Sequence, residues 1–520
     1  MTGLLDELKT HFGFDSFRRG QQEAVSAALG GRDVLMVMPT GAGKSLCYQL
    51  PALLREGEVT VVVSPLVSLM ADQVAGLERA AAGRAVLVNS QRDAAENRDA
   101  LERVRSGEAR LLYVAPERFA SAGFVEALAG VSVGMFVVDE AHCISQWGHD
   151  FRPDYFELPR AARALGARQL FACTATATPR VAADVLARLG LRDPVRVTTG
   201  FDRPNLSYLV GRSSGDADRE RRIAEVLADA AARPAIVYAG TRARSERLAA
   251  TLAAQLGVAT TAYHAGLERA ARSEAQRRFM DGEVEIVVAT NAFGMGIDKR
   301  DVRTVCHASV PESLEAYYQE AGRAGRDGLP ARCLLFAAGR DKGLHVHFIN
   351  SSPGGEARAA RWALYRGIWG FVEGDGCRRV AIQRHFGDRS PPTLADGVPC
   401  CDVCDPAALP RPRAAARAPA GGGGGGPAGV AGDIDAAILD VVASAHPGVG
   451  RTRTVEILRG GRSKVVVANG YDSLAAYGAF AHLSSAEALA RVDALIARGV
   501  LRSTGGRFPK LAMGRERLAA

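Results

Sequence analysis

A chain of 520 residues is too long for one ordinary hydrophobic core, so its length predicts three or four domains. A composition of 47% hydrophobic and 23% charged residues is typical of a soluble globular protein. No apolar run approaches the roughly 20 residues that cross a bilayer, which excludes a membrane-spanning protein, and the N-terminus has no apolar signal core. We therefore expect a cytoplasmic protein with no membrane partner, nucleoid-associated if its source is bacterial.

The net charge of +8 favours a polyanionic partner such as nucleic acid, but only weakly. Of the 65 basic residues only six are lysines, and such an excess of arginine is also typical of a biased genome composition.

Short apolar runs punctuate residues 1–200. They are unbroken rather than alternating, as in parallel strands that are buried on both faces. Helical stretches lie between them, which predicts a doubly wound α/β unit. The runs are DVLMVM, VTVVVS, AVLVNS, ARLLYVAP, VGMFVVDE and QLFACTAT.

The same pattern restarts after FDRPN (201–205) and predicts a second α/β unit over residues 201–340. Two such units in series leave a cleft between them, and ligands favour such clefts. The expected strands of the second unit are AIVYAG, VATTAYH, VEIVVATN, RTVCHAS and ARCLLFAA.

Three further regions complete the chain. Residues 341–408 are predicted to be helical and then loop-rich, and residues 409–432, with six consecutive glycines, form an expected flexible linker. Residues 433–520 have the helical spacing of three helices, the third with Ser484 or Ser485 as its N-cap. A hairpin with a Gly505–Gly506 turn follows, which completes a winged-helix order.

A phosphate-binding loop is predicted at MPTGAGKS (38–45), between a strand and a helix. Gly41 and Gly43 let backbone amides approach phosphates at a helix N-terminus, and Thr40 of the same loop is also expected to bind ATP. Lys44 would reach the β- and γ-phosphates of ATP, and Ser45 would ligate Mg²⁺. The strict pattern has Gly where this chain has Met38.

Two carboxylates, Asp139 and Glu140, end the strand VGMFVV. Such a pair is often an ordinary solvated turn. With the phosphate-binding loop upstream, Asp139 is predicted to hold Mg²⁺ through water, and Glu140 to orient and deprotonate the attacking water.

Arginines of the second α/β unit occur in YYQEAGRAGRDG (317–328). Surface helices rich in arginine are usually only solvated. However, a γ-phosphate between two lobes needs a positive group from the opposite lobe. Arg326 is the expected finger and Arg323 its neighbour at the phosphates, so hydrolysis would require the lobes to close.

With these motifs in hand, the chain resembles the RecQ family of superfamily-two DNA helicases over residues 12 to about 510. The order of the family's motifs is matched by FGFDSFRRGQ (12–21), MPTGAGKSLCYQLPAL (38–53), SPLVSLMADQ (64–73), YVAPERF (113–119), DEAHCISQWGHDFRPDY (139–155), TATAT (174–178), ATNAFGMGIDK (289–299) and QEAGRAGRDG (319–328). The resemblance implies two tandem RecA-like lobes, a helical zinc-binding subdomain and a C-terminal winged helix.

The resemblance also implies further nucleotide contacts. Gln21 would read the adenine edge, with Phe14 and Arg18 on either side of the ring, although Phe14 also fits core packing. Gly296 and Asp298 would contact the nucleotide or couple the lobes.

The stretch behind the two carboxylates resembles the family's aromatic-rich loop, whose side chains would meet single-stranded DNA. Stacking gives about 1–3 kcal/mol per base, and breaking one DNA stacking step costs about 1.4 kcal/mol. One captured base would therefore offset roughly one broken step. Core packing is the alternative for Phe156 and Phe151. The expected DNA contacts are Trp147, His149, Phe151, Arg152 and Tyr155, with Ser64 in the first lobe and Thr241 in the second.

Four of the nine cysteines, Cys377, Cys400, Cys401 and Cys404, fall where the family has a zinc site. Adjacent Cys400 and Cys401 depart from the family's paired spacing, so His385 is an alternative ligand. A disulfide is less expected in an intracellular chain. The four thiolates predict a closed structural Zn²⁺ site.

The tail resembles the family's winged-helix module, which would bind duplex DNA with its hairpin as a wedge. Phe508, just beyond the turn, fits either a wedge or core packing. The long linker departs from the family's compact attachment, and the helical DNA-binding domain that follows the winged helix in many relatives is expected to be absent.

The resemblance implies an ATP-dependent DNA helicase that translocates 3′ to 5′ in DNA repair or recombination. Its cofactors would be ATP, Mg²⁺ and Zn²⁺, and its partners single-stranded and tailed or forked duplex DNA. A single-strand-binding protein is a candidate partner, and a monomer is consistent with the sequence. The rivals are a duplex translocase or strand-annealing factor without processive unwinding, a non-enzymatic DNA-binding scaffold, and an RNA helicase.

Overall fold

The computed structural model describes residues 3–65, 67–81, 83–90, 92–294, 298–352, 354–409, 434–461, 463–504 and 509–514. It divides into two compact units, Met1–Ala414 and Ala415–Ala520, which are described separately. Almost all of the expected linker (409–432), Gly296, the Gly505–Gly506 turn and Phe508 lie outside the described residues.

The first lobe is built on a seven-stranded parallel sheet of order β3-β4-β2-β5-β6-β1-β7. Alternate side chains of each strand enter cores on opposite faces: Leu35 and Val37 on one, Val34 and Met36 on the other. The strands are β1 (Val34–Val37), β2 (Val59–Val63), β3 (Ala85–Val88), β4 (Leu111–Val114), β5 (Val133–Val138), β6 (Gln169–Thr174) and β7 (Val195–Thr198). Because β5, β6 and β1 are neighbours, the loops that leave their carboxyl ends meet at one edge of the sheet.

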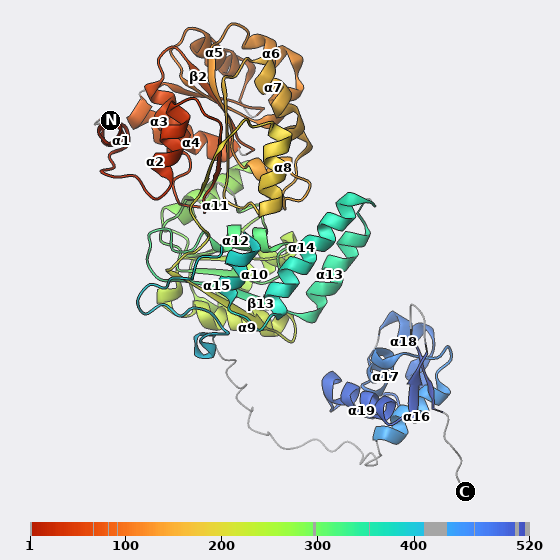
Figure 1. The fold of residues 1–520 in the computed structure, drawn as a ribbon. Coiled ribbons are helices and arrows are strands. Elements are labelled where there is room, and N and C mark those ends of the chain that lie inside the picture. The colour runs from red at the N-terminus through yellow and green to blue at the C-terminus, as the bar shows by residue number, and fades with distance from the viewer. Residues whose placement is uncertain are drawn as a thin grey trace. The chain divides into compact units, whose positions relative to one another are not determined.

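Helices cover both faces of this sheet (Figure 1). Helix α8 shows how the sequence sets their ends: the Thr178 side chain caps its first turn, Pro179 opens it, and Gly190 closes it with a φ of 69°. The helices are α1 (Gly3–Phe12), α2 (Gln21–Leu29), α3 (Leu46–Leu54), α4 (Val67–Ala81), α5 (Ala94–Arg105), α6 (Ala122–Ala127), α7 (Leu158–Ala164) and α8 (Pro179–Leu189).

The second lobe has a six-stranded parallel sheet of order β10-β11-β9-β12-β13-β8. Its strands are β8 (Leu206–Arg212), β9 (Ala235–Tyr238), β10 (Thr260–Tyr263), β11 (Ile286–Ala289), β12 (Thr304–His307) and β13 (Ala331–Ala337). Its helices are α9 (Asp216–Leu227), α10 (Arg242–Leu256), α11 (Arg269–Met280) and α12 (Leu314–Ala321). The structure thus adds edge strands β7 and β8 to those expected, and the tandem α/β architecture is confirmed.

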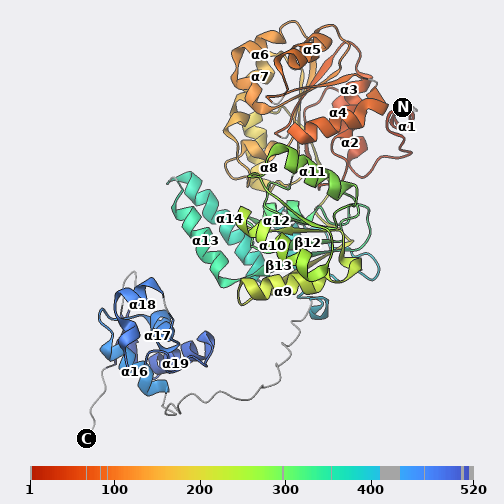
Figure 2. The ribbon, with the colours of Figure 1, turned by 180° about the vertical axis from the view of Figure 1, so that it is seen from behind.

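A helical subdomain follows, with α13 (Gly339–Asn350), α14 (Glu356–Glu373) and α15 (Arg378–His385). Helices α13 and α14 extend side by side from the second lobe in both views (Figures 1 and 2). The loop after α15 covers the outer edge of β8, where the Tyr208 amide donates to the Cys400 carbonyl. Phe386 stacks on Phe201, between the lobes, with ring centroids 4.3 Å apart. One continuous core therefore links both lobes and the subdomain.

The second unit contains α16 (Ile434–Ser444), α17 (Arg451–Leu458), α18 (Lys464–Ala468), α19 (Ser485–Ala497) and the antiparallel pair β14 (Leu501–Ser503) and β15 (Leu511–Met513). Ser484 caps α19 and Glu487 completes a capping box. The described residues form one apolar core in which helices precede a hairpin. The winged-helix expectation is confirmed, with the short α18 as an addition.

Short 3-10 helices occur at η1 (Pro116–Ala120), η2 (Ala141–Ile144), η3 (Pro153–Glu157), η4 (Ala230–Ala232), η5 (Pro406–Ala408) and η6 (Tyr471–Ser473). Within the described ranges, no helix combines the length and the apolar character needed to cross a bilayer.

Candidate functional site

The loop between β1 and α3 has the backbone of a phosphate cradle. Gly41 and Gly43 both have a φ of 83°, a conformation that favours glycine. A Cβ atom at Gly43 would lie 2.5 Å from Nε2 of Gln21, so a side chain at this position would displace the Gln21 amide. Lys44 Nζ donates to the carbonyl oxygen of Met38 at 3.3 Å. In this structure Lys44, which is expected to bind phosphates, is thus hydrogen-bonded to the first residue of its own loop.

The segment before α2 holds this loop from outside. The Gln21 amide donates to the carbonyls of Ala42 and Gly43, each at 3.1 Å, and its oxygen accepts from the Arg18 amide at 2.8 Å. Arg18 Nη1 donates to Gly41 O at 2.8 Å, and the Phe14 ring is half exposed. Gln21 therefore supports the loop backbone in this structure, and its contact with adenine stays a prediction.

Asp139 and Glu140 leave β5 beside this loop, and both are buried. Asp139 Oδ1 accepts from the Glu140 amide at 2.9 Å and from the Cys173 thiol at 3.3 Å. Glu140 has a φ of 47°, an unusual backbone conformation for a residue other than glycine, which often marks functional sites. The carboxyl group of Asp139 is thereby held by two hydrogen bonds, and the backbone turns at Glu140 directly after it.

The two carboxyl groups have opposite electrostatics. Burial raises the pKa of Asp139 to about 6, with the Glu140 charge adding to the rise and Lys44 opposing it. Burial also disfavours the charge on Glu140, but His142, Lys44 and His149 outweigh it and lower its pKa to about 2. His142 Nδ1 lies 3.3 Å from Glu140 Oε2. Glu140 is therefore ionised at neutral pH, as a general base must be.

Two arginines reach this site from the second lobe, on the segment that follows α12. Arg323 is only 3% exposed, and a Cβ atom at Gly41 would lie 3.6 Å from Cγ of Arg326. The neighbouring Gly322 faces Thr40 in the same way. The phosphate cradle of one lobe is thus in contact with the arginine segment of the other.

The charges of these arginines are only partly compensated. Arg326 Nη1 donates to Asp298 Oδ1 at 2.7 Å. Burial and Arg323 lower the pKa of Arg326 to about 10, against the effect of Asp298. The buried Nε atoms of both arginines have no hydrogen-bond partner among the residues that the structure describes. Buried donors without partners are costly, so this arrangement fits an anion between the lobes.

Residues at the lobe junction hold the segment that carries Arg323 and Arg326. In the sequence these junction residues indicated only the boundary between the two α/β units. Arg203 donates to the carbonyls of Gly322, Ala324 and Gly325 at 3.0–3.2 Å. Asn205 donates to Gly325 O at 2.8 Å. In the sequence, the only sign that Arg203 and Asn205 hold the arginine segment was their position in FDRPN, where the α/β pattern restarts.

The aromatic-rich loop departs from expectation at its buried end. Tyr155 is fully buried and its hydroxyl donates to the Asp139 carbonyl at 3.0 Å, so its ring is not available to a base and the prediction of a DNA contact is wrong. Ser64 is also wrong as a contact in this structure, because its side chain is buried at the end of β2. Both lie under the site rather than on its surface.

The outer part of the loop remains accessible. Trp147 is half-buried, with Cζ of Arg180 lying 3.1 Å from its ring centroid. Phe151 is partly buried and packs on exposed Phe156, 5.3 Å between centroids. Arg152 is tied to Asp150 at 3.1 Å. In the second lobe, Thr241 is exposed and caps α10. DNA contacts by Trp147, Phe151, Arg152 and Thr241 stay predictions.

His149 joins the lobes instead of facing outward. Its Nε2 lies 3.0 Å from Oε1 of Gln319 on α12, and its ring stacks on His142 with centroids 4.6 Å apart. His142 in turn neighbours Glu140. These contacts run from the second lobe to the buried carboxylate, and the expected DNA contact of His149, which is partly buried, stays a prediction.

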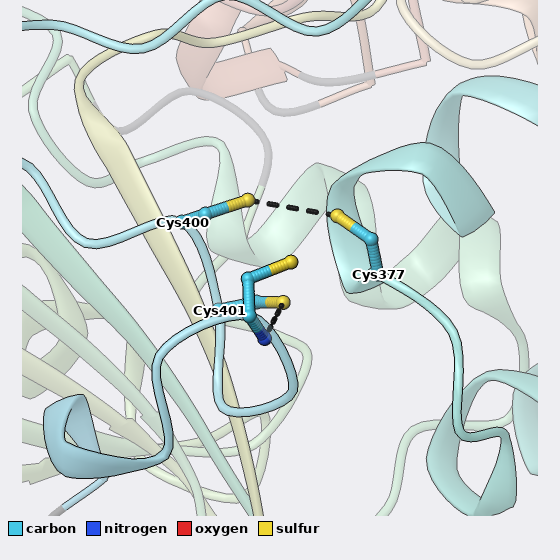
Figure 3. A group of neighbouring side chains, drawn as sticks. Cys377, Cys400 and Cys401 are labelled. Atoms are coloured by element: carbon cyan, nitrogen blue, oxygen red, sulfur yellow. Dashed lines mark hydrogen bonds between the residues drawn. The ribbon is translucent and has the colours of Figure 1, made fainter.

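The four clustered cysteines meet at one point between α15 and the loop that ends at Cys404. Figure 3 shows the thiols of Cys377 and Cys400 facing each other, 3.5 Å apart. Their sulfur atoms and those of Cys401 and Cys404 all lie within 4.8 Å of one another. Cys401 Sγ also accepts from the amides of Arg378 and Cys404. This set fits tetrahedral Zn²⁺, and the expected zinc site is confirmed.

His385 is not part of that cluster. Its Nε2 lies 2.8 Å from Oε1 of Glu315 on α12, so the alternative ligand is already paired elsewhere. All four cysteines, including both members of the adjacent pair, are the ligands that the structure brings together.

Comparisons with known proteins agree with this geometry. The chain matches the family models described as DEAD/DEAH box helicase over residues 18–185 and helicase conserved C-terminal domain over 218–328. It also matches RecQ zinc-binding over 339–405 and the RQC domain over 434–518. Each α/β lobe and each smaller domain therefore has a match of its own.

Two of the curated relatives cover 97% and 77% of this chain. The ATP-dependent DNA helicase RecQ of Bacillus subtilis is 36% identical over 97% of this chain and 81% of its own length. The protein of the same name from Haemophilus influenzae is 40% identical over 77% of this chain and 63% of its own length.

Solved structures support the fold. The DUF1998 helicase MrfA bound to DNA and AMPPNP has a TM-score of 0.55 at 20% identity, covering 68% of this chain and 56% of that one. The helicase Lhr of Mycobacterium smegmatis has a TM-score of 0.53 at 21% identity, covering 98% of this chain and 60% of that one.

Proposed function

Because the chain belongs to the RecQ family of ATP-dependent DNA helicases, we propose that it moves 3′ to 5′ along single-stranded DNA and unwinds duplexes in DNA repair or recombination. ATP would be hydrolysed at the seam between the two α/β lobes. The observation that carries the proposal is the position of Arg326, from the second lobe, whose Cγ would lie 3.6 Å from a Cβ atom added at Gly41 in the phosphate cradle of the first.

The arginines supply the charge that such a seam needs. Phosphoryl transfer depends on positioning and on cations that stabilise charge in the transition state. Arg326 and Arg323 have buried donors without partners in the described chain, and both would turn to the phosphates. Since they belong to the lobe opposite the cradle, hydrolysis would be fastest when the lobes are closed.

The first lobe supplies the remaining groups. Lys44 would leave the Met38 carbonyl for the β- and γ-phosphates, and Glu140, ionised near neutral pH, would accept the proton of the attacking water. Ser45 and Asp139 are the residues that would hold Mg²⁺, which neutralises phosphate charge when it is bound with ATP.

DNA would be sensed by the aromatic-rich loop. A base stacked on Trp147 would move the loop that also carries His149. His149 contacts both Gln319 of the second lobe and His142 beside Glu140. This chain of contacts offers a short physical route from a bound strand to the general base and to lobe closure.

The test is unwinding of 3′-tailed, 5′-tailed, forked and blunt duplexes with ATP and Mg²⁺. We expect unwinding of 3′-tailed and forked DNA, and its loss in Lys44→Ala and Arg326→Ala. Removal of an arginine finger typically costs about 10³–10⁵ in rate. Unwinding of only 5′-tailed DNA would mean that the protein moves 5′ to 3′, opposite to the proposed direction. ATP-driven movement on duplexes without strand separation would instead support a duplex translocase.

A further inference from the structure

Arg180 covers the ring that is expected to capture a base. Arg180 lies in the first turn of α8, and its guanidinium carbon is 3.1 Å from the centroid of the Trp147 ring. The Trp147 ring is half-buried and packs against the main core of the first lobe. A base cannot stack on the ring face beneath Arg180 unless the guanidinium moves away.

No carboxylate of the described residues holds the Arg180 guanidinium in place. Arg180 is exposed, and among the described residues no acidic side chain lies within ion-pair distance of it. Arg188 on the same helix is by contrast paired with Asp184 at 2.7 Å. In the aromatic-rich loop, Arg152 is paired with Asp150. Arg180 is thus an uncompensated cation whose recorded contact is the face of an indole ring.

The backbone beneath Arg180 is fixed even though its side chain is not. Pro179 packs against Gly387 of the helical subdomain, where an added Cβ atom would lie 2.7 Å from Cγ of Pro179. Thr178 caps the same turn through the Val181 amide. The Cα atom of Arg180 is therefore held in place, while a change of side-chain rotamer can move the guanidinium from the Trp147 ring to a neighbouring position.

We infer that Arg180 exchanges its place on Trp147 for a phosphate of the bound strand. A base takes the ring face, and the guanidinium pairs with a phosphate beside that base, which suits its planar set of donors. Arg180 is then a DNA-binding residue that also covers Trp147 when no strand is present. This inference rests on the proposed function, since it takes single-stranded DNA as the ligand.

The first measurement is the salt dependence of oligo(dT) binding by the full chain. Each phosphate contact to a single strand contributes about 0.7 to the slope of log K against log salt concentration. Arg180→Gln should reduce the magnitude of the slope by about 0.7. Arg163→Gln, which removes the same charge from an exposed site on α7, should leave the slope unchanged.

The second measurement follows Trp147 alone, in a background with Trp362→Phe and Trp369→Phe, the other two tryptophans of the chain. Without DNA, acrylamide should quench Trp147 more strongly in Arg180→Gln than in the parent. With oligo(dT) bound, the two proteins should be quenched equally, because a base covers the ring in both.

An unchanged salt slope in Arg180→Gln would overturn the inference, even if its quenching rose, because Arg180 would then only cap the ring. Equal reduction of the slope in Arg163→Gln would overturn it as well. Failure of the proposed function looks different: the unsubstituted protein would bind no single strand, or its ATPase rate would not respond to one.

Discussion

At the scale of single residues, the site depends on neighbours that give the same chemical group different properties. Asp139 and Glu140 are adjacent carboxyl groups at one strand end, yet the pKa of the first is raised and that of the second is lowered. The sequence identified the pair and its surrounding motifs. It did not show that burial raises the pKa of Asp139 or that contact with His142 lowers the pKa of Glu140, because burial and side-chain contacts are set only in the folded protein.

The raised pKa of Asp139 predicts a pH-dependent stability. Its folded-state pKa of about 6 exceeds the ordinary 3.8, so its contribution to folding is complete below about pH 4 and is lost as pH rises through 6. Asp139→Asn keeps the oxygen that accepts from the Glu140 amide but cannot ionise. The nucleotide-free variant should therefore be more stable than the parent at pH 8, where the parent carboxylate is ionised.

Thermal or denaturant unfolding at pH 5.5 and pH 8 checks this, and the advantage should shrink at the lower pH. Glu140→Gln is the matched control. Its carboxyl has a lowered pKa, so it stabilises the fold above pH 4.5, and its removal should lower stability at both pH values where Asp139→Asn raises it or leaves it unchanged. An Asp139→Asn advantage that did not change with pH would contradict the electrostatic account.

At the scale of elements, the parallel topology explains why distant motifs meet. The strands β5, β6 and β1 are neighbours, so the loops after them share one edge of the sheet. The edge strand β7 was missed because it is only half-buried and carries polar residues, as in VRVT. The burial of Tyr155 was missed because its partner is a backbone carbonyl, which leaves no trace in the local sequence.

The junction between the lobes should control catalysis without touching ATP. Arg203 holds three carbonyls of the segment that carries Arg323 and Arg326. A misplacement of about 1 Å costs on the order of 10²-fold in rate. Arg203→Ala should therefore lower kcat for ATP by 10- to 100-fold while KM changes little.

Steady-state kinetics at saturating single-stranded DNA separate these constants. Arg212→Ala, in the same lobe but on the exposed end of β8, provides a matched loss of arginine. A rise in KM with kcat unchanged in Arg203→Ala would mean that the junction affects nucleotide binding instead of the position of the finger.

The loop after α15, which carries Cys400, Cys401 and Cys404, should stabilise the outer edge of β8 when Zn²⁺ is bound. Its anchor is the hydrogen bond from Tyr208 to Cys400, next to the thiol cluster. Cys400→Ser should lower the bound zinc and the melting temperature together. His385→Ala should retain a full equivalent of zinc, because His385 is paired with Glu315. Metal analysis of the purified variants decides this, and loss of zinc in His385→Ala would contradict the four-cysteine assignment.

At the scale of the whole molecule, the proposed motor has two lobes that share one ATP site. The tandem lobes, the zinc subdomain and the winged helix could all be predicted from motif order and patterning. The contact between His149 and Gln319 could not, because these residues are 170 positions apart in the chain and meet only in the folded protein. That contact is where binding of a strand would be converted into closure.

The most direct test of this coupling is the steady-state ATPase rate with and without oligo(dT), measured for the unsubstituted protein and for Trp147→Ala. The account predicts a clear stimulation by DNA in the first, and loss of that stimulation with ATP affinity intact in the second. An ATPase rate that single strands leave unaltered, or a normal stimulation in Trp147→Ala, would contradict it.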